Sequence, residues 1–449
     1  MKSKYIVISK NKKIYSAEEY LQKEGCSNEF KRFIEIEAYG SSKVDLDKGE
    51  SSKYLYYANK MGFRWELNSP IGFMSCDYKA NFILHNVEEL ARLSAQKINI
   101  PVYEVSGARA FDMSYQVVKD YAYLYGERLI QSSVGQERKI VFGYDGSYPQ
   151  FNLASLYSLS YKQIPFAHFS NAECYRLEQS GECMLFYRMR QFHMPDYHPY
   201  FKDINEAWEG YIKIEKIIMA SGKDVGIDYL ICGKVSSEKE WEKNKKNIIE
   251  IAYRNKQDIL MEILYDEKSY YWSVNIDYKI IDSFGQSREI SCIQIDIENS
   301  KRLGISYIDS NNVKQYPVII HSALIGGIER YLYMLFDDFK NRFPLWLSPI
   351  QLRLLPINES HIKFCENICK KYSKYKIRID IDDRAESISK KIISARDELI
   401  PNYLLIGDKE VSGENMEKLD ELIKSIHKKN KSKPFLHYNW PMLKSQQVR

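Results

Sequence analysis

The most informative part of the sequence is Val318-Ile-Ile-His-Ser-Ala-Leu-Ile-Gly-Gly-Ile-Glu-Arg-Tyr-Leu-Tyr-Met-Leu-Phe336. Its apolar run, its Gly-Gly break and its later apolar residues at helical spacing predict a strand, a turn and a helix in succession. Arg330 falls in the first turn of that helix, where the positive end of the helix dipole disfavours a cation. A bound anion would resolve this conflict. Alternatively, Arg330 extends into water or pairs with Glu329 or another nearby acid.

Length and composition indicate a globular protein with several domains. A chain of 449 residues suggests about two to four domains. Its 44% hydrophobic and 28% charged residues are ordinary for a folded protein, and the net charge of +5 permits a nucleic-acid partner without demanding one. The eight cysteines form no repeated CxxC pair, which argues against a zinc ribbon and a secreted disulfide framework. The N-terminus does not resemble a signal peptide and no apolar run is long enough for a membrane span, so we expect a cytoplasmic protein.

The first two thirds of the chain mix helical and extended patterns. Residues 1–50 combine a short strand, the capping-box sequence Ser16-Ala-Glu-Glu and a polar linker, and we interpret them as an N-terminal appendage. Pro101 cannot donate to a strand ladder, so its strand should begin there or lie at a sheet edge. The patterns predict helices at 81–97, 114–129, 204–220 and within 236–265, and strands at 98–105, 139–143, 271–281 and 289–296.

Residues 172–194 carry a cluster of arginines. Side-chain types alternate on both sides of Gln179-Ser-Gly-Glu182, which predicts a hairpin of two antiparallel strands. Arg176, Arg188 and Arg190 would then lie on one hairpin and form a candidate phosphate-binding site. A solvated charged face is an equally good interpretation of the pattern taken alone.

The pattern changes after Phe336. Strand and helix alternate from 345 to 408, and a last helix near 415–428 precedes a basic tail, which predicts a small α/β domain. Cys365 and Cys369 lie four residues apart on one of these helices, and we expect buried core residues rather than a metal site. The predicted fold class is therefore α+β: residues 51–340 form an antiparallel sheet flanked by helices, and residues 341–449 form the small α/β domain.

Taken together and in order, these segments resemble a class II aminoacyl-tRNA synthetase, specifically threonyl-tRNA synthetase of the archaeal type. The resemblance runs from about Ser51 to Glu410. Helix 81–97 with Pro101 resembles motif 1, the dimer-interface element. Arg176-Leu-Glu178 with Arg188-Met-Arg-Gln-Phe192 resembles motif 2, and Gly326-Gly-Ile-Glu-Arg330 resembles motif 3. Three further segments also resemble the family: Met194-Pro-Asp-Tyr-His198, Ile320-His321 and Phe343-Pro-Leu-Trp-Leu-Ser-Pro-Ile-Gln351.

The resemblance implies an enzyme that activates threonine with ATP to threonyl-adenylate and transfers it to tRNA(Thr). Adenylate formation brings two anions together, so positioned cations must neutralise the growing charge. The resemblance implies that Arg176 and Arg330 are catalytic, that Asp196 receives the threonine ammonium and that Gln294 lines the substrate pocket. The ATP site, with Mg²⁺ accompanying the nucleotide, would comprise Arg176, Glu178, Arg188, Glu289 and Arg330.

One departure from the family concerns a zinc ion. In the family, one cysteine and two histidines hold Zn²⁺ and leave a coordination position open for threonine. His198 and His321 match the two histidines, but the cysteine position is Ser147, and a serine hydroxyl is a poor zinc ligand. Asp145 or Cys174 could substitute for it. If zinc is lost, the filter that separates threonine from valine is lost with it.

Other departures concern tRNA. The family's strand after the Gly407–Glu410 segment is replaced by a short path into a helix, and an anticodon-contacting Asn position is Ala385. Lysines and arginines could still bind the phosphate backbone. Residues 1–50 are too few for an editing domain, so a separate trans-editing protein is expected, together with a homodimer. The alternative function is a diverged paralogue that keeps the fold and nucleotide or tRNA binding but does not threonylate.

Overall fold

A computed structural model describes residues 3–41, 53–135, 138–265, 270–436 and 438–448. The predicted linker at 40–53 lies mostly outside the described residues. The chain forms two compact units. Unit 1 comprises 1–52, 66–73 and 91–338, and unit 2 comprises 53–65, 74–90 and 339–449.

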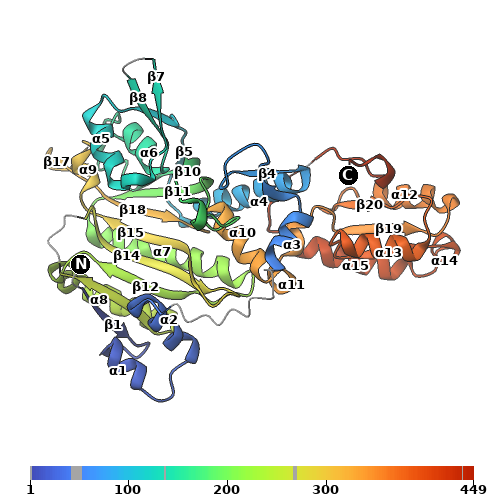
Figure 1. The fold of residues 1–449 in the computed structure, drawn as a ribbon, viewed down its shortest axis with the longest axis horizontal. Coiled ribbons are helices and arrows are strands. Elements are labelled where there is room, and N and C mark those ends of the chain that lie inside the picture. The colour runs from blue at the N-terminus through green and yellow to red at the C-terminus, as the bar shows by residue number, and fades with distance from the viewer. Residues whose placement is uncertain (1–2, 42–52, 136–137, 266–269, 437, 449) are drawn as a thin grey trace. The chain divides into compact units, whose positions relative to one another are not determined.

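Unit 1 is built around a ten-stranded sheet with the order β2-β1-β13-β12-β14-β15-β18-β11-β10-β5 (Figure 1). Neighbouring strands are antiparallel except in the pairs β12–β13 and β5–β10, which confirms the predicted α+β class. The strands are β1 (Ser3–Ile8), β2 (Ile14–Ser16), β5 (Val102–Glu104), β10 (Phe166–Tyr175), β11 (Gln191–Phe201), β12 (Leu230–Val235), β13 (Ile259–Leu264), β14 (Trp272–Ile281), β15 (Ser287–Asp296) and β18 (Val318–Ala323).

Helices cover this sheet, and α7 packs against β11, β15 and β18, whereas α8 packs against β12, β13 and β14. The helices of unit 1 are α1 (Ala17–Gln22), α2 (Asn28–Tyr39), α5 (Gln116–Ala122), α6 (Ser147–Ala154), α7 (Ile204–Lys223), α8 (Glu238–Asn255), α9 (Asn299–Arg302) and α10 (Ile328–Asp337), with the 3₁₀ turns η1 (Gln96–Ile98), η2 (Tyr123–Arg128) and η3 (Ser180–Glu182). The smaller strands are β6 (Ala110–Asp112), β7 (Gln131–Val134), β8 (Arg138–Phe142), β9 (Leu159–Ser160), β16 (Tyr307–Ile308) and β17 (Lys314–Gln315).

The N-terminal residues extend the large sheet. Strand β1 pairs with β13 from Ser3 opposite Leu264 to Ile8 opposite Ile259. The predicted capping box is present, because the Ser16 side chain accepts from the backbone of Glu19 and the Glu19 side chain accepts from the backbone of Ser16. Helices α1 and α2 bury their apolar faces with β1 in a small core of their own.

The strand at the opposite edge of the sheet also agrees with the prediction from the sequence. Strand β5 begins directly after Pro101 and is the last strand of the sheet, as the proline predicted. The segment from Val318 to Phe336 forms β18, a turn and α10, as predicted. Gly326 in this turn has φ +88°, and a Cβ there would lie 2.2 Å from the carbonyl oxygen of Ile290. Only glycine fits this turn, since a side chain would be both strained and obstructed.

Unit 2 contains the small α/β fold predicted for the C-terminal residues. Its parallel sheet has the order β20-β19-β21. Cys365 and Cys369 are buried in its core, as expected. The elements are α3 (Lys53–Lys60), β3 (Phe63–Trp65), β4 (Met74–Cys76), the first turns of α4 (Tyr78–Ala95), α11 (Phe339–Arg342), η4 (Leu345–Leu347), β19 (Leu352–Pro356), η5 (Glu359–His361), α12 (Ile362–Tyr372), β20 (Ile379–Ile381), α13 (Ile388–Asp397), β21 (Tyr403–Ile406), α14 (Asp408–Val411), α15 (Met416–Asn430) and η6 (Lys444–Gln446).

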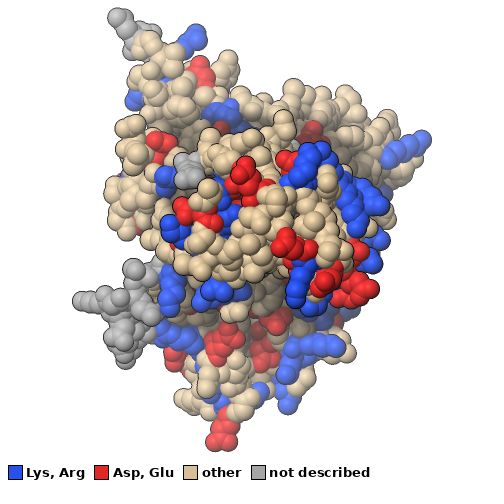
Figure 2. Space-filling view, turned by 90° about the vertical axis from the view of Figure 1, so that its right-hand side faces the viewer, with Lys and Arg blue, Asp and Glu red and all other residues tan. Residues whose placement is uncertain are grey.

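The chain after β21 passes through α14 directly into α15, as the sequence predicted. In the described part of unit 2, the sheet therefore has no fourth strand. Basic and acidic side chains are interspersed on the molecular face drawn in Figure 2, in keeping with the small net charge.

Candidate active site

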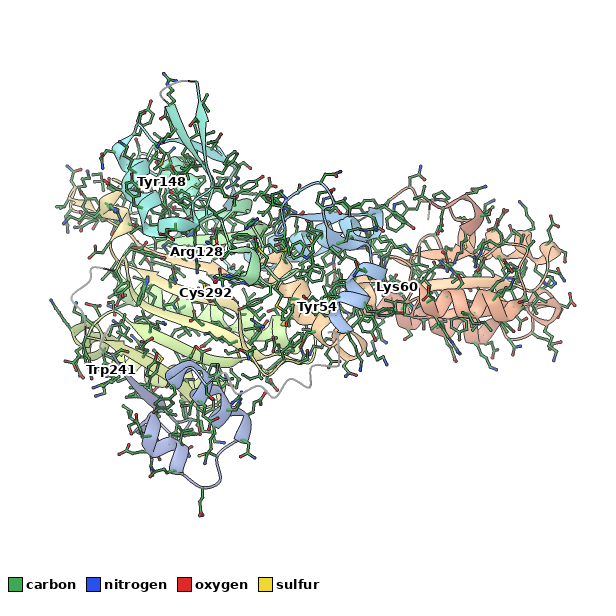
Figure 3. The ribbon with its side chains drawn as sticks, viewed as in Figure 1. Tyr54, Lys60, Arg128, Tyr148, Trp241 and Cys292 are labelled. Carbon is green, nitrogen blue, oxygen red and sulfur yellow. The ribbon has the colours of Figure 1, made fainter. Side chains whose placement is uncertain are left out.

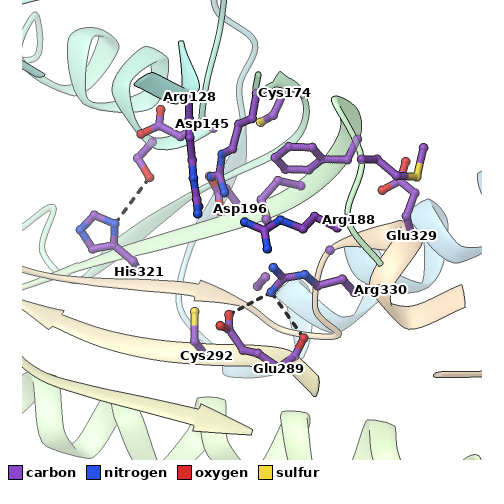
Figure 4. Close-up of a pocket in the computed structure, with 18 of the residues that line it drawn as sticks. Arg128, Asp145, Cys174, Arg188, Asp196, Glu289, Cys292, His321, Glu329 and Arg330 are labelled. Carbon is purple, nitrogen blue, oxygen red and sulfur yellow. Dashed lines mark hydrogen bonds and ion pairs between the residues drawn. The ribbon is translucent and has the colours of Figure 1, made fainter. Parts of the chain in front are cut away.

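A pocket of about 350 Å³ lies on unit 1 (Figure 4). Strands β11, β15 and β18, the connection between β10 and β11, and the first turns of α6 and α10 all contribute to its lining. The predicted site residues that line it are Arg176, Glu178, Arg188, Asp196, Glu289, Gln294, His321 and Arg330, and Ser147 lines it with them. His198 is fully buried and contacts Ser147.

The register of the sheet explains why residues from distant parts of the sequence meet here. Gln294 on β15 lies opposite His321 on β18, and Asp196 on β11 lies opposite Ala323 on β18. Alternate residues of a strand share a face, so His198 lies on the same face as Asp196. Three strands therefore bring the predicted substrate-binding and metal-binding residues to one area.

Three predicted arginines enter the pocket, and each contacts a residue of the site. Arg188 Nε donates to Glu178 Oε2 over 2.8 Å, Arg330 Nη1 donates to Glu289 Oε1 over 3.1 Å, and Arg176 Nε donates to a backbone carbonyl over 3.1 Å. The side chains of Arg188 and Arg330 are 32% and 30% exposed. Both guanidinium groups are thus oriented by a carboxylate and remain accessible to an anion in the pocket.

The predicted strand positions of the arginines are wrong, although the two predicted strands do pair. β10 ends at Tyr175 and β11 begins at Gln191, so the arginines lie in the connection, residues 176–190. A 3₁₀ turn and a positive φ of 68° at Phe186 interrupt the extended backbone there. Arg190 donates to the carbonyl of Glu178 over 2.9 Å and lies outside the pocket lining, so it holds the connection in shape.

Arg330 occupies the first turn of α10, as predicted. The alternative in which it pairs with Glu329 is wrong, because Glu329 is buried and accepts from the backbone N–H of His193 over 2.9 Å and lies 2.7 Å from its ring nitrogen. Arg330 pairs with another nearby acid, Glu289, as the same alternative allowed, and lies over the ring of Tyr187, 5.1 Å from its centre. The cation at the helix start therefore points into the pocket.

Asp196 lies at the floor of the pocket beside α6. Burial, and then the nearby Asp145 carboxylate, raise the pKa of Asp196 to about 7, although the backbone N–H of Gly146 opposes this increase. A Cβ at Gly146 would lie 2.3 Å from Asp196 Oδ2. Glycine at this position thus allows the backbone to approach the carboxylate closely.

Ser147 lies between the two predicted histidines. Its Oγ is 3.1 Å from His198 Nε2 and 3.5 Å from His321 Nδ1. The outer ring nitrogens also have partners: His198 Nδ1 lies 3.0 Å from Gln150 Oε1, and His321 Nε2 lies 2.7 Å from Asp296 Oδ2. Burial, and then the neighbouring His321, hold the pKa of His198 well below its ordinary value, so its ring is neutral.

The residues around these histidines do not fit a zinc ion of the family's type. Ser147 supplies a neutral hydroxyl where a thiolate is needed. Asp145 accepts from Tyr125 over 2.6 Å and from a backbone N–H over 3.1 Å, and burial raises the pKa of the Cys174 thiol well above its ordinary value. Among the described residues, no group of three His, Cys, Asp or Glu side chains is arranged to bind a metal.

Several further residues line the pocket that the sequence did not predict. Arg128, a fourth arginine in the lining, comes from η2, where Gly126 interrupts the helix predicted at 114–129. Cys292 lies on β15 (Figure 3), on the same face as Gln294, and also lines the pocket (Figure 4). Tyr125 and Tyr271 complete the wall near Asp145 and His321. No local pattern distinguishes these residues, because only the tertiary structure turns them toward the pocket.

Comparison with protein families identifies the two parts of the chain. Residues 150–339 match the "tRNA synthetase class II core domain (G, H, P, S and T)", and residues 351–420 match the "Anticodon binding domain". The fold is therefore that of a class II aminoacyl-tRNA synthetase with an anticodon-binding domain.

Sequence relatives narrow this class to one family. The chain is 36% identical to a threonine--tRNA ligase of Pyrobaculum islandicum over 90% of the chain and 69% of the relative, and 38% identical to one of Hyperthermus butylicus over 92% and 66%. A relative of the same name from Nanoarchaeum equitans is 36% identical over 86% of the chain and 63% of its own length. The chain belongs to the threonine--tRNA ligase family, and it spans about two thirds of the length of these relatives.

Solved structures support the fold. The chain resembles the RNA binding domain of threonyl-tRNA synthetase from Cryptosporidium parvum with a TM-score of 0.73 and 18% identity, over 86% of this chain and 99% of that one. It resembles prolyl-tRNA synthetase from the same organism with a TM-score of 0.64 and 14% identity, over 86% and 80%. Within the described residues, no helix is both long and apolar enough to cross a lipid bilayer.

Proposed function

We propose that the chain activates threonine with ATP and transfers it to tRNA(Thr). The observation that carries this proposal is the convergence of Arg176, Arg188 and Arg330 with Asp196 in one pocket. These three arginines suit the polyphosphate of one ligand, and Asp196 suits the ammonium group of the other. Membership of the threonine--tRNA ligase family supports threonine as the amino acid.

The proposed reaction has two steps. A carboxylate oxygen of threonine attacks the α-phosphorus of ATP, the bond to the bridging oxygen breaks, and pyrophosphate leaves with its electron pair. A ribose hydroxyl of tRNA then attacks the threonyl carbonyl carbon, and AMP leaves. Arg176 would stabilise the charge at the α-phosphate, whereas Arg188 and Arg330 would bind the outer phosphates. Glu178 and Glu289, by orienting these two arginines, would preorganise the ATP site.

We assign substrate recognition to two further residues. Asp196 would bind the ammonium group of threonine, and Gln294 would contact the bound amino acid. Mg²⁺, when bound with ATP, would neutralise phosphate charge, and Glu289, whose side chain is 38% exposed, is the lining carboxylate that suits it.

We assign the activation step to a catalytic domain at 51–340, tRNA binding to an anticodon-binding domain at 341–449, and residues 1–50 to an appendage that joins the catalytic sheet. Residues 53–65 and 74–90 of the first domain fold with unit 2, so the activation step itself belongs to unit 1. The family matches at 150–339 and 351–420 support the two main domains. Contacts of unit 2 with tRNA would involve the phosphate backbone, because the sheet of its described part ends at β21 and Ala385 cannot hydrogen-bond a base through its side chain. A homodimer, a cytoplasmic location and a separate trans-editing protein complete the proposal.

The test is threonine-dependent exchange between ATP and labelled pyrophosphate by the purified full chain, followed by aminoacylation of a tRNA(Thr) transcript. We expect both activities, and Arg176→Ala should abolish the exchange. Exchange without aminoacylation would favour the alternative of a diverged paralogue. A chain that gives no exchange with any amino acid would contradict the proposal.

A further inference from the structure

In the cluster of Ser147, His198 and His321, two ring nitrogens face a hydroxyl group that has only one hydrogen. Both imidazole rings are buried and lie nearly perpendicular, with centres 4.8 Å apart. Ser147 Oγ is the polar atom between them, 3.1 Å from one ring nitrogen and 3.5 Å from the other. The positions of the ring protons therefore determine what else this cluster can bind.

The outer partners fix both tautomers. His321 Nε2 lies 2.7 Å from Asp296 Oδ2, and Asp296 also accepts from the backbone N–H and the side-chain amide of Asn299. Since the Asp296 carboxylate is the acceptor in both of its contacts with Asn299, it also accepts from His321, and Nε2 of His321 carries the hydrogen. In the neutral imidazole, Nδ1 of His321, which faces Ser147, is then a lone pair.

The same holds for His198. Its Nδ1 lies 3.0 Å from Gln150 Oε1, and the orientation of the Gln150 amide is set because its Nε2 donates to the carbonyl of Asp196 over 3.2 Å. Nδ1 of His198 therefore carries the hydrogen, and Nε2 is a lone pair that faces Ser147.

Two lone pairs thus face one hydroxyl group. Ser147 has a single hydrogen, and the shorter distance places it on His198 Nε2. His321 Nδ1 is left as an acceptor, and His321 lines the pocket together with Asp196. A ligand with an ammonium group for Asp196 and a nearby hydroxyl hydrogen for His321 satisfies both groups.

We propose that this chain recognises the side-chain hydroxyl of its amino acid without a metal ion, through donation to Nδ1 of His321 while Ser147 donates to His198. The identity of the amino acid in this inference rests on the proposed function. The hydrogen bond to His321 takes the place of the zinc ion, which Ser147 cannot ligate. An analogue that has a methyl group in place of the hydroxyl leaves Nδ1 without a donor. An unpaired buried acceptor weakens binding by about 10- to 100-fold, so threonine should bind that much more tightly than valine.

The experiment combines metal analysis with calorimetric binding of threonine and valine to the full chain, both with and without EDTA. Binding without ATP needs no Mg²⁺, so the chelator tests the site alone. We expect substoichiometric zinc in the purified chain and an unchanged preference for threonine in EDTA. His321→Leu should lose the preference, whereas Ser155→Ala, a serine just after the other end of α6, should keep it.

Ser147→Cys is the second variant, and its expected readout is a gain of metal binding. It restores a thiolate beside two convergent lone pairs, so zinc titration should show stoichiometric binding that the unmodified chain lacks. If Ser147→Cys binds no zinc, the two lone pairs do not converge and the inference is wrong. This test needs no active enzyme and does not depend on the folding of the His321 variant.

The remaining outcomes separate the inference from the proposed function. Stoichiometric zinc in the unmodified chain, loss of threonine binding in EDTA, or failure of threonine to bind at all would overturn the inference. If exchange is active while zinc is stoichiometric, the function stands and the inference fails. If threonine binds without metal but no exchange occurs, the inference stands and the function fails.

Discussion

At the scale of single residues, the guanidinium groups are the strongest functional feature of the pocket. Arg330 combines a hydrogen bond to Glu289 over 3.1 Å with a position over the ring of Tyr187. A planar group with several donors can keep both contacts and still bind a phosphate. A lysine at this position has the charge but not the planar fork of donors.

The first prediction follows from this geometry. Arg330→Lys should lower kcat/KM for ATP in the exchange reaction by about 10²-fold, because one preorganised donor to the phosphates is lost. Steady-state exchange kinetics at varied ATP concentration measure this effect. Arg302→Lys, an exposed arginine whose Nη2 donates to the carbonyl of Asp120, should leave the kinetics unchanged. Equal effects of the two substitutions would contradict the assigned role.

Individual residues also show what the sequence could predict about the site. Arg330 was predictable because its position conflicts with the helix dipole, and the motif resemblance supplied Asp196 and His321. Arg128 was not predictable, because its place in the pocket depends on the break at Gly126. Arg330 does pair with a nearby acid, but this acid is Glu289 and not Glu329, since adjacent residues on a helix point in different directions.

At the scale of secondary-structure elements, the turn between β18 and α10 determines where Arg330 points. Gly326 has φ +88°, and the carbonyl of Ile290 on the neighbouring strand approaches to 2.2 Å of the position a Cβ would take. The backbone of the turn cannot shift without moving α10. The stability of this element and the function of the site are therefore linked.

The second prediction tests this link. Gly326→Ala should destabilise the chain by roughly 3 kcal/mol, since it adds a backbone clash to the strain of a left-handed alanine, and it should also reduce exchange activity. Gly304→Ala is the matched control, because Gly304 has φ +76° but nothing within 4 Å of the added Cβ. It should lose about 1 kcal/mol and keep its activity. Urea denaturation measures both losses, and similar values would argue against the clash.

The third prediction concerns Glu398, which follows α13 and connects two other elements. It pairs with Arg353 of β19 over 3.0 Å and with Lys444 of η6. Burial raises the pKa of Glu398, but the two cations outweigh burial and lower the pKa to about 2. Because the folded-state pKa is the lower one, this stabilisation is present above the unfolded pKa of about 4.3 and is lost as the pH falls toward 2.

Glu398→Gln should therefore reduce the free energy of unfolding at pH 7 by about 1–2 kcal/mol, after allowance for partial solvent screening. The difference from the unmodified chain should shrink as the pH falls from about 4 to about 2. Urea denaturation across this pH range is the measurement. Glu386→Gln removes a surface pair with Lys390 and should change little at any pH. A difference that persists at low pH would mean that Glu398 acts through packing instead.

At the scale of the whole molecule, unit 2 is assembled from segments that are distant in the sequence. Phe82 of α4 is fully buried and contacts the rings of Tyr438 and Trp440, each with centres 5.4 Å apart. The guanidinium of Arg378 lies over the same ring at 4.7 Å. Residues 74–90 therefore fold together with the C-terminal residues although more than 240 positions separate them.

The fourth prediction is that Phe82→Ala destabilises unit 2 by about 3–5 kcal/mol, the usual loss for a buried phenylalanine. All residues of the candidate active site belong to unit 1, so aminoacylation of tRNA should fall more than ATP–pyrophosphate exchange. Ile393→Ala, which truncates a side chain that is 64% exposed, is the control and should affect neither activity. Equal loss of both activities after Phe82→Ala would contradict the assignment of separate steps to the two units.

The sequence by itself determined the class of fold, most of the elements and most of the residues of the candidate site, because hydrophobic periodicity, capping signals and motif residues are local properties of the chain. It predicted the strand, turn and helix from Val318 to Phe336 and the missing strand after Gly407. The tertiary structure decided which side chains face one another. Strand register and ring contacts act between distant segments, so only they could bring Ser147 between His198 and His321.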